Sequence, residues 1–252
     1  MNEKGENRRA LPKFFLTMLG SLLAGGVLGF VIGMSHVFGL DMESAAAWLD
    51  GVLESVTPWG ITATSVLTLG GAFFLYHRAR KVVSGWDGGD ENEASEEAER
   101  LLSWALLLSA VQLIVNFFFM AAVTRYFPAK NGLPAVVEFI VSCALVIFAQ
   151  QKIVDLERKM NPEKHGSVYD MKFQKKWMES CDESEQRQIG QACYRAYMVT
   201  TRVCTGLWLA LVLLSMVYRI SLLPVFVLLL VWGTMQVVYT LECIRLSKKG
   251  GE

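Results

Sequence analysis

The sequence lacks the residue groups on which most catalytic and metal sites depend. It has only three histidines, His36, His77 and His165, which fall on three separate segments. There is no H-E-x-x-H, G-x-S-x-G or Walker A motif, and the five cysteines form neither a C-x-x-C pair nor a zinc-spaced group with histidine. We therefore predict that the protein is not an enzyme and has no catalytic, cofactor-binding or metal-binding residue.

An excess of either charge is also lacking. Lys and Arg number 24 in total among the 252 residues, and so do Asp and Glu. A net charge of zero gives no general attraction to nucleic acid or to an acidic substrate, so we expect no nucleic-acid partner. The information in the charges must come from their positions along the chain.

The dominant feature of the sequence is its long apolar runs. Hydrophobic residues make up 53% of the chain, and the mean hydropathy is +0.35, above the usual range of a soluble domain. A helix needs about 20 residues to cross the hydrocarbon layer. Six runs approach that length: 14–34, 59–76, 101–123, 135–149, 203–218 and 225–241. The sequence predicts an all-α fold, a polytopic transmembrane bundle of six spans that forms one integral membrane domain over 1–252.

The positions of the basic residues predict how these spans are oriented, because connections on the cytoplasmic side carry more Lys and Arg. With the N-terminus inside, the inner segments hold 20 of these residues and the outer segments hold 3. Both termini and the long loop 151–198 are then cytoplasmic. We expect a multi-pass protein of the cell (plasma) membrane that contacts the lipid bilayer.

Proline positions predict three tandem helical hairpins. Pro58, Pro134 and Pro224 each follow an outer turn, near the first position of a returning helix, where the missing N–H has no helical partner to lose. Ser180–Glu183 matches the S-x-x-E capping box and predicts a helix start. Residues 41–56 have apolar side chains at helical spacing and predict a separate amphipathic helix on the outer surface. An inverted three-plus-three repeat is a numerical alternative.

The first predicted span has one narrow face of small side chains. Ser21, Gly25, Gly29 and Gly33 recur at four-residue spacing. Such a face lets another helix approach closely and gain van der Waals contact. It indicates packing within the monomer or, alternatively, a homodimer interface.

Polar residues inside the apolar runs form a second candidate group. Gln112 and Asn116 lie one turn apart in the third span, Gln236 lies in the sixth, and Glu138 lies near the outer end of the fourth. In hydrocarbon these side chains seek partners across helices. They act either as structural links between helices or as the lining of a path for a polar ligand or ion; for Glu138, Arg125 is one candidate partner.

The segment 161–183 has the densest pattern outside the spans. Asn161-Pro162 ends the helix that leaves the membrane. A helix over 169–178 would place three aromatic residues on one face and three lysines on a neighbouring arc: Tyr169, Phe173 and Trp177, then Lys172, Lys175 and Lys176. This pattern favours either a strap that lies in an anionic lipid interface or a docking surface for a cytoplasmic or membrane protein.

The same segment resembles a known protein family. The motif comprises Asn161-Pro-x-Lys-x-Gly-Ser-Val-Tyr-Asp170, Lys172-Phe-x-Lys-Lys-Trp177 and Ser180-Cys-Asp-Glu183. It is similar to a family of uncharacterised six-span membrane proteins of Gram-positive bacteria, classed as a domain of unknown function. The resemblance implies a bacterial plasma-membrane location, and it implies no activity or substrate.

Two functions fit these patterns. The first is a non-catalytic membrane component that acts as a partner or regulator of a transport or envelope system. The second is a small transporter, or the membrane-spanning subunit of one, whose path is lined by the polar residues at 112, 116, 138 and 236.

Overall fold

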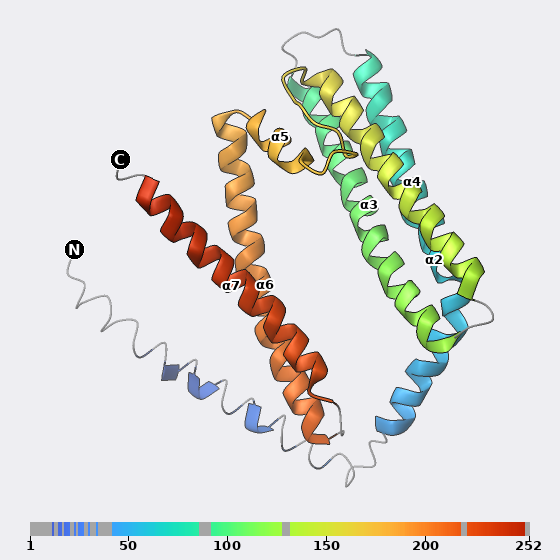
Figure 1. Cartoon of the computed structure of the whole chain (residues 1–252), viewed down its shortest axis with the longest axis vertical. Coiled ribbons are helices and arrows are strands. Elements are labelled where there is room, and N and C mark those ends of the chain that lie inside the picture. Colours follow the sequence, from blue (N-terminus) through green and yellow to red (C-terminus); the bar gives the residue numbers. More distant parts are fainter. Residues whose placement is uncertain are drawn as a thin grey trace. The chain divides into compact units, whose positions relative to one another are not determined.

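A computed structural model describes residues 42–85, 92–127, 132–217 and 221–249, with scattered residues between 12 and 34. Every regular element in these ranges is helical, as predicted. The elements are α2 (Met42–Gly85), α3 (Asn92–Tyr126), α4 (Gly132–Met160), α5 (Phe173–Glu179), α6 (Glu183–Val217) and α7 (Leu223–Lys249), all shown in Figure 1.

Five of the described helices are long and apolar enough to cross a membrane. They contain the second to sixth predicted spans. α4 and α6, whose apolar runs are short, reach 29 and 35 residues because each continues into an amphipathic stretch. The structure describes only scattered residues of the first predicted span, 14–34. A sixth membrane-crossing helix at 14–34, and with it the set of three tandem hairpins, therefore stays a prediction.

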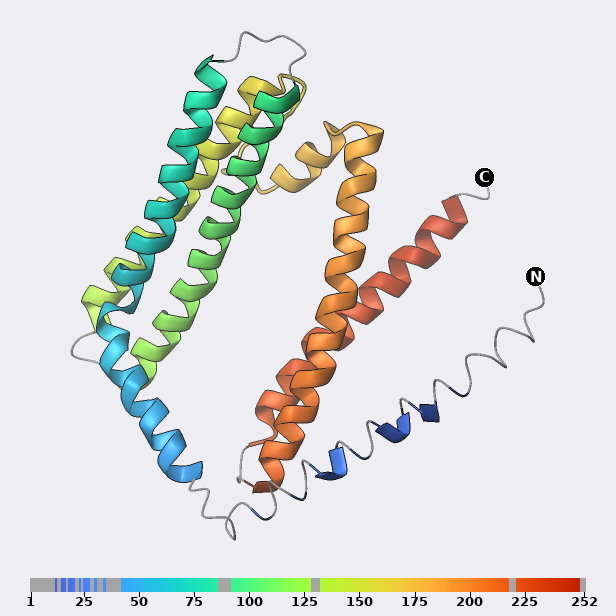
Figure 2. The same cartoon turned by 180° about the vertical axis from the view of Figure 1, so that it is seen from behind.

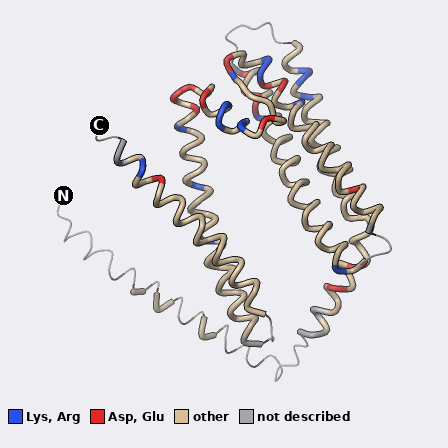
Figure 3. The backbone as a smooth tube through the Cα atoms, in the orientation of Figure 1, with Lys and Arg blue, Asp and Glu red and all other residues tan. Residues whose placement is uncertain are grey.

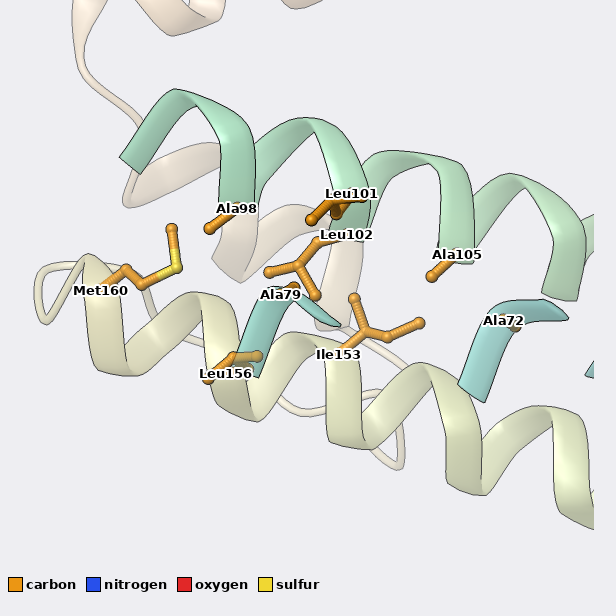
Figure 4. Packing of buried hydrophobic residues seen from close by; sticks show 9 residues of the cluster. All are labelled: Ala72, Ala79, Ala98, Leu101, Leu102, Ala105, Ile153, Leu156 and Met160. Atoms are coloured by element: carbon orange, nitrogen blue, oxygen red, sulfur yellow. The ribbon is translucent and has the colours of Figure 1, made fainter. Parts of the chain in front are cut away.

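The first of two compact units comprises residues 45–188. α2, α3 and α4 lie side by side in it (Figures 1 and 2). Near the C-terminal ends of α2 and α4, small and aliphatic side chains form a core among all three helices (Figure 4). The core comprises Ala72 and Ala79 from α2, Ala98, Leu101, Leu102 and Ala105 from α3, and Ile153, Leu156 and Met160 from α4. The alanines allow close approach of helix backbones, which is how helices associate where lipid provides no hydrophobic drive.

The start of α2 differs from the prediction. The amphipathic stretch 41–56 and the second span were expected to be separate helices divided at Pro58, but one helix of 44 residues runs through this proline. Proline removes a single backbone hydrogen bond, and a helix tolerates that loss when its neighbours hold it in place. Thr57, beside Pro58, is 2% exposed, and its hydroxyl donates to the carbonyl of Leu53 at 2.6 Å. Pro134 and Pro224 do lie in the first turns of α4 and α7.

The second unit comprises residues 189–252 and the described residues of 1–44. α6 begins in the first unit and continues into this one. The Tyr197 ring of α6 stacks on that of Tyr239 in α7, with centroids 4.5 Å apart and planes inclined by 22°. The Tyr197 hydroxyl also donates to Gln236. These two contacts join α6 and α7 at one level.

Gly60 permits the close contact between α2 and α3. A Cβ atom at Gly60 would lie 2.2 Å from the nearest ring atom of Phe119, far inside van der Waals contact. Phe119 is itself only 8% exposed, so its ring has little room to move away. A side chain at this position would therefore force the helices apart.

We predict that Gly60→Ala lowers the free energy of unfolding by about 1–3 kcal/mol, the usual cost of overpacking. The measurement is reversible unfolding in mixed SDS and maltoside micelles, followed by circular dichroism. Gly70→Ala is the matched control on the same helix, because nothing lies within 4 Å of a Cβ there. Adding Phe119→Leu to Gly60→Ala should restore part of the loss. Equal effects of the two alanine substitutions would show that the contact is unimportant.

Candidate functional site

A hydrogen-bonded polar network crosses the three helices of the first unit. Gln112 and Asn116 of α3 are both 0% exposed. The Gln112 Oε1 atom accepts from Thr68 of α2 at 2.7 Å, while its Nε2 donates to Ser65 of α2 at 2.8 Å and to Asn116 Oδ1 at 2.7 Å. The Asn116 Nδ2 donates to Ser142 Oγ of α4 at 2.9 Å, and Ser142 Oγ lies 2.8 Å from Ser65 Oγ. Each helix thus contributes to one network.

The network lies about half a membrane thickness from the charged end of the unit. Thr68 is ten residues from Arg78 on α2, and Ser142 is ten residues from Lys152 on α4. Ten helical residues rise about 15 Å, half of the roughly 30 Å hydrocarbon layer. In Figure 3 the charged residues gather toward the ends of these helices, with long uncharged stretches between them. The network occupies the depth at which unpaired polar groups are most costly.

The other predicted intramembrane residues have separate partners. Glu138 of α4 accepts a hydrogen bond from Thr62 of α2. Its candidate partner Arg125 instead forms an ion pair with Asp50, 3.5 Å away. Gln236 belongs to the second unit, where Tyr197 is its partner. The predicted group of four therefore has three distinct sets of contacts, and only Gln112 and Asn116 contact each other.

The small-residue face predicted on the first span falls mostly outside the described residues. Ser21, Gly29 and Gly33 are among those not described. Gly25 is helical, and in the described part of the chain nothing lies within 4 Å of a Cβ built on it.

The loop 161–182 has a defined conformation because a buried lysine holds it to α6. Lys164 is 3% exposed; its ammonium bonds to the Glu185 carboxylate and lies 3.6 Å from Cys181 Sγ. Burial opposes the charged ammonium, but the hydrogen bond and charge of Glu185 outweigh it and raise the pKa of Lys164 above its ordinary 10.5. The stabilisation is therefore complete at neutral pH and declines only as the pH rises through this raised value.

Glu185 also closes the N-terminus of α6. The Glu185 N–H donates to Asp182 Oδ1 at 2.8 Å, and the Asp182 N–H donates to Glu185 Oε2 at 3.0 Å. This reciprocal pair is a capping box, and its backbone hydrogen bond lowers the pKa of Asp182. The predicted box at Ser180 and Glu183 is therefore wrong by two residues. Ser180 instead accepts from the His165 N–H at 3.1 Å, which joins the two ends of the loop.

Two further contacts fix the middle of the loop. The Gln151 Oε1 atom of α4 accepts from Ser167 Oγ at 2.9 Å and from the Val168 N–H at 2.8 Å. Gly166 has a φ of 134°, which side chains disfavour. A Cβ at Gly166 would also lie 2.9 Å from the Phe173 ring. Lys164, Gly166 and Ser167 of the sequence motif thus have structural roles.

The predicted docking residues divide into an internal group and an exposed group. α5 begins at Phe173, so the expected helix over 169–178 is wrong at its start, and Tyr169 precedes it in a turn. The half-buried rings of Phe173 and Trp177 lie 5.6 Å apart. Lys176 Nζ bonds to Asp170 at 2.5 Å, which lowers the pKa of Asp170, and Lys175 lies 3.7 Å from Glu179.

The exposed members of the predicted set are Tyr169, Lys172, Lys175 and Lys176. We call the exposed residues Tyr169, Met171, Lys172 and Lys175 the loop face. Tyr169 is 65% exposed and Met171 is 101% exposed. Met171 was not among the residues predicted from sequence. Its exposure follows from the turn at 171–172, a feature that has no helical or strand periodicity.

Sequence reasoning also missed the partners of the predicted polar residues. Thr64, Ser65 and Thr68 share one face of α2, and Ser142 lies at the matching depth of α4. Hydroxyl residues at the same depth as Gln112 and Asn116 were the available signal. Lys164 and Glu185 gave no such signal, because 20 residues separate them.

Comparison with known proteins places the chain in a family whose function is unknown. A family described as "Protein of unknown function (DUF3169)" matches residues 8–242. No curated protein and no solved structure matches the chain.

Gln112→Leu should lower the stability of the first unit by about 1–2 kcal/mol, the range for interhelical hydrogen bonds in membranes. The substitution keeps the volume but leaves Thr68, Ser65 and Asn116 without one partner each. The measurement is mixed-micelle unfolding. Ile114→Leu, at a side chain that is 70% exposed on the same helix, is the control. If both variants unfold alike, the network does not stabilise the unit.

Lys164→Met should increase amide hydrogen exchange in the loop 161–182 about tenfold. A hydrogen bond to a charged group contributes about 1.5–3 kcal/mol, and the low end applies here because the Glu185 side chain is 37% exposed. Lys172→Met is the matched control, since Lys172 is exposed in the same loop. Unchanged exchange in Lys164→Met would show that this pair does not order the loop.

Proposed function

We propose that this chain, which belongs to the family described as "Protein of unknown function (DUF3169)", is a non-catalytic multi-pass membrane component that docks a protein partner on the loop 161–182. The positive-inside pattern supports a cytoplasmic location for this loop and for both termini. The same pattern, with the apolar helices, supports a multi-pass location in the cell membrane.

The observation that carries this proposal is an ordered loop with an exposed apolar and basic face. Lys164, Gln151 and the Asp182–Glu185 capping box hold the backbone. The loop face nevertheless leaves Tyr169 and Met171 open to solvent. Aromatic and methionine side chains are enriched in protein interfaces, and a preformed surface loses less conformational entropy on binding.

The charge balance of the loop favours a protein partner over a lipid strap. Residues 161–182 contain four lysines and four acidic residues. Lys164 is buried, and Lys175 and Lys176 each lie beside a carboxylate. Attraction to anionic lipid requires an excess of basic residues. Mixed charges around exposed apolar side chains suit a protein surface of complementary pattern instead.

The buried network bears on the transporter alternative. A transport path needs polar side chains that a substrate can reach, whereas Gln112 and Asn116 are 0% exposed and bonded to neighbouring helices. This arrangement favours a structural role for both residues. We therefore propose the docking function ahead of transport.

Co-purification of the tagged full chain from native membranes tests the docking proposal. The variant Tyr169→Ser, Met171→Ser, Lys172→Gln, Lys175→Gln alters the loop face and leaves the groups that hold the loop unchanged. The matched control changes four other exposed residues: Glu163→Gln, His165→Gln, Gln174→Ser and Glu183→Gln. We expect wild type and control to recover a protein that the loop-face variant loses by at least tenfold.

Two readouts keep this result interpretable. Hydrogen exchange in 161–182 should be the same in the variant and the control, which shows that the loop remains ordered. Equal protein recovery from all three samples contradicts the proposal. Loss of bound lipid, with protein recovery unchanged, would instead assign the loop face to the membrane surface.

A further inference from the structure

A cavity of about 620 Å³ opens between α2 and α4 at the end of the first unit where both helices finish. On α2 it is lined by residues 76, 80, 83 and 84, and on α4 by residues that include 152, 155, 156 and 159. Each set has the i, i+4, i+7 or i, i+3, i+4 spacing of a single helix face. The volume is within the range of small-molecule sites. None of the lining residues belongs to the loop face or to the buried polar network.

Positive charge dominates the lining of this cavity. Arg80, Lys152, Arg158 and Lys159 contribute four cations against a single carboxylate, that of Asp155. Gln151 Nε2 donates to the Asp155 carboxylate at 2.8 Å. Across the described ranges, none of the four cations forms an ion pair. Four cations that face one cavity repel each other, and an anion bound there would relieve this repulsion.

The position of the cavity along the helices matches the lipid headgroup layer. Tyr76 is the last residue of the apolar run on α2, and Lys152 follows the apolar run on α4 closely. The lining extends from these two residues to Ser84 and Lys159, about 12 Å along α2 and about 10 Å along α4. Basic pockets between membrane helices at this level hold the phosphates of lipid headgroups.

The apolar residues of the lining favour a lipid over a free anion as the ligand of this cavity. Tyr76, Val83 and Leu156 line the same cavity as the four cations. A soluble phosphate ion would gain nothing from these three side chains. A phospholipid would place its phosphate beside the cations and its glycerol and first acyl carbons against Tyr76, the lining residue at the end of the apolar run of α2.

We propose that this cavity is a binding site for the phosphate headgroup of an anionic phospholipid. Arg80 supplies the planar guanidinium that can bond two phosphate oxygens at once, and Lys159 and Lys152 supply point charges from the opposite helix. The site is independent of the docking proposal, because the two share no residue.

Titration of the full chain in neutral detergent with dioleoyl phosphatidylglycerol tests this site, with binding counted by native mass spectrometry. We expect Arg80→Gln with Lys159→Gln to weaken binding about 30-fold, since each cation near an anionic headgroup contributes roughly a factor of five. Arg100→Gln with Arg187→Gln removes two positive charges from exposed positions outside both the cavity and the loop face, and should retain wild-type affinity. Arg80→Lys with Lys159→Arg keeps the charges and should also bind.

Two further titrations, with other ligands, identify which ligand the cavity binds. Dioleoyl phosphatidylcholine, which has no net charge, should bind no more tightly to wild type than to the cavity variant. Inorganic phosphate at 10 mM should neither raise the melting temperature nor displace phosphatidylglycerol. Equal losses of affinity in the cavity variant and in the Arg100, Arg187 control overturn the site. Stabilisation by phosphate equal to that by the lipid overturns the lipid assignment.

Discussion

The amide of Gln112 has no water to bond with at the middle of a membrane, and the arrangement of the first unit depends on that constraint. An unbonded amide in hydrocarbon costs several kcal/mol. Thr68 and Ser65 of α2 satisfy this amide directly, and Asn116 extends the network to Ser142 of α4. Three helices must hold one register for these bonds to form together. The close contact at Gly60 and the alanine core near the charged end then become possible at the same register.

In the loop 161–182 a buried charged group likewise needs a partner, and this need determines the local structure. Lys164 is buried in the loop 161–182, and Glu185 of α6 provides the opposite charge. Because Glu185 also closes the capping box with Asp182, one carboxylate fixes both the loop and the start of α6. The sequence motif at 161–183 is explained in large part by these contacts and by Gly166. The residues left exposed, Tyr169 and Met171 among them, are the ones free to serve a partner.

The helical spans were predictable because apolar length and helical periodicity are local properties of the chain. The runs at 101–123 and 225–241 lie inside α3 and α7, and Pro134 and Pro224 mark helix starts. Prediction failed where two local signals competed. Pro58 was interpreted as a helix start, but packing on α3 and α4 holds α2 continuous through it. Likewise Ser180 and Asp182 could each cap α6, and Glu185 favoured the second.

The sequence by itself determined that this is a helical protein with several membrane-crossing segments, and it identified Gln112 and Asn116 as groups in need of partners. Hydropathy and polarity are properties of each residue, so they can be read without coordinates. Only the tertiary structure decided which side chains satisfy them and which remain free. Arg80 and Lys159 are 79 residues apart in the chain, and they share a cavity because α2 and α4 pack side by side. Such a juxtaposition follows from helix packing, which no local pattern encodes.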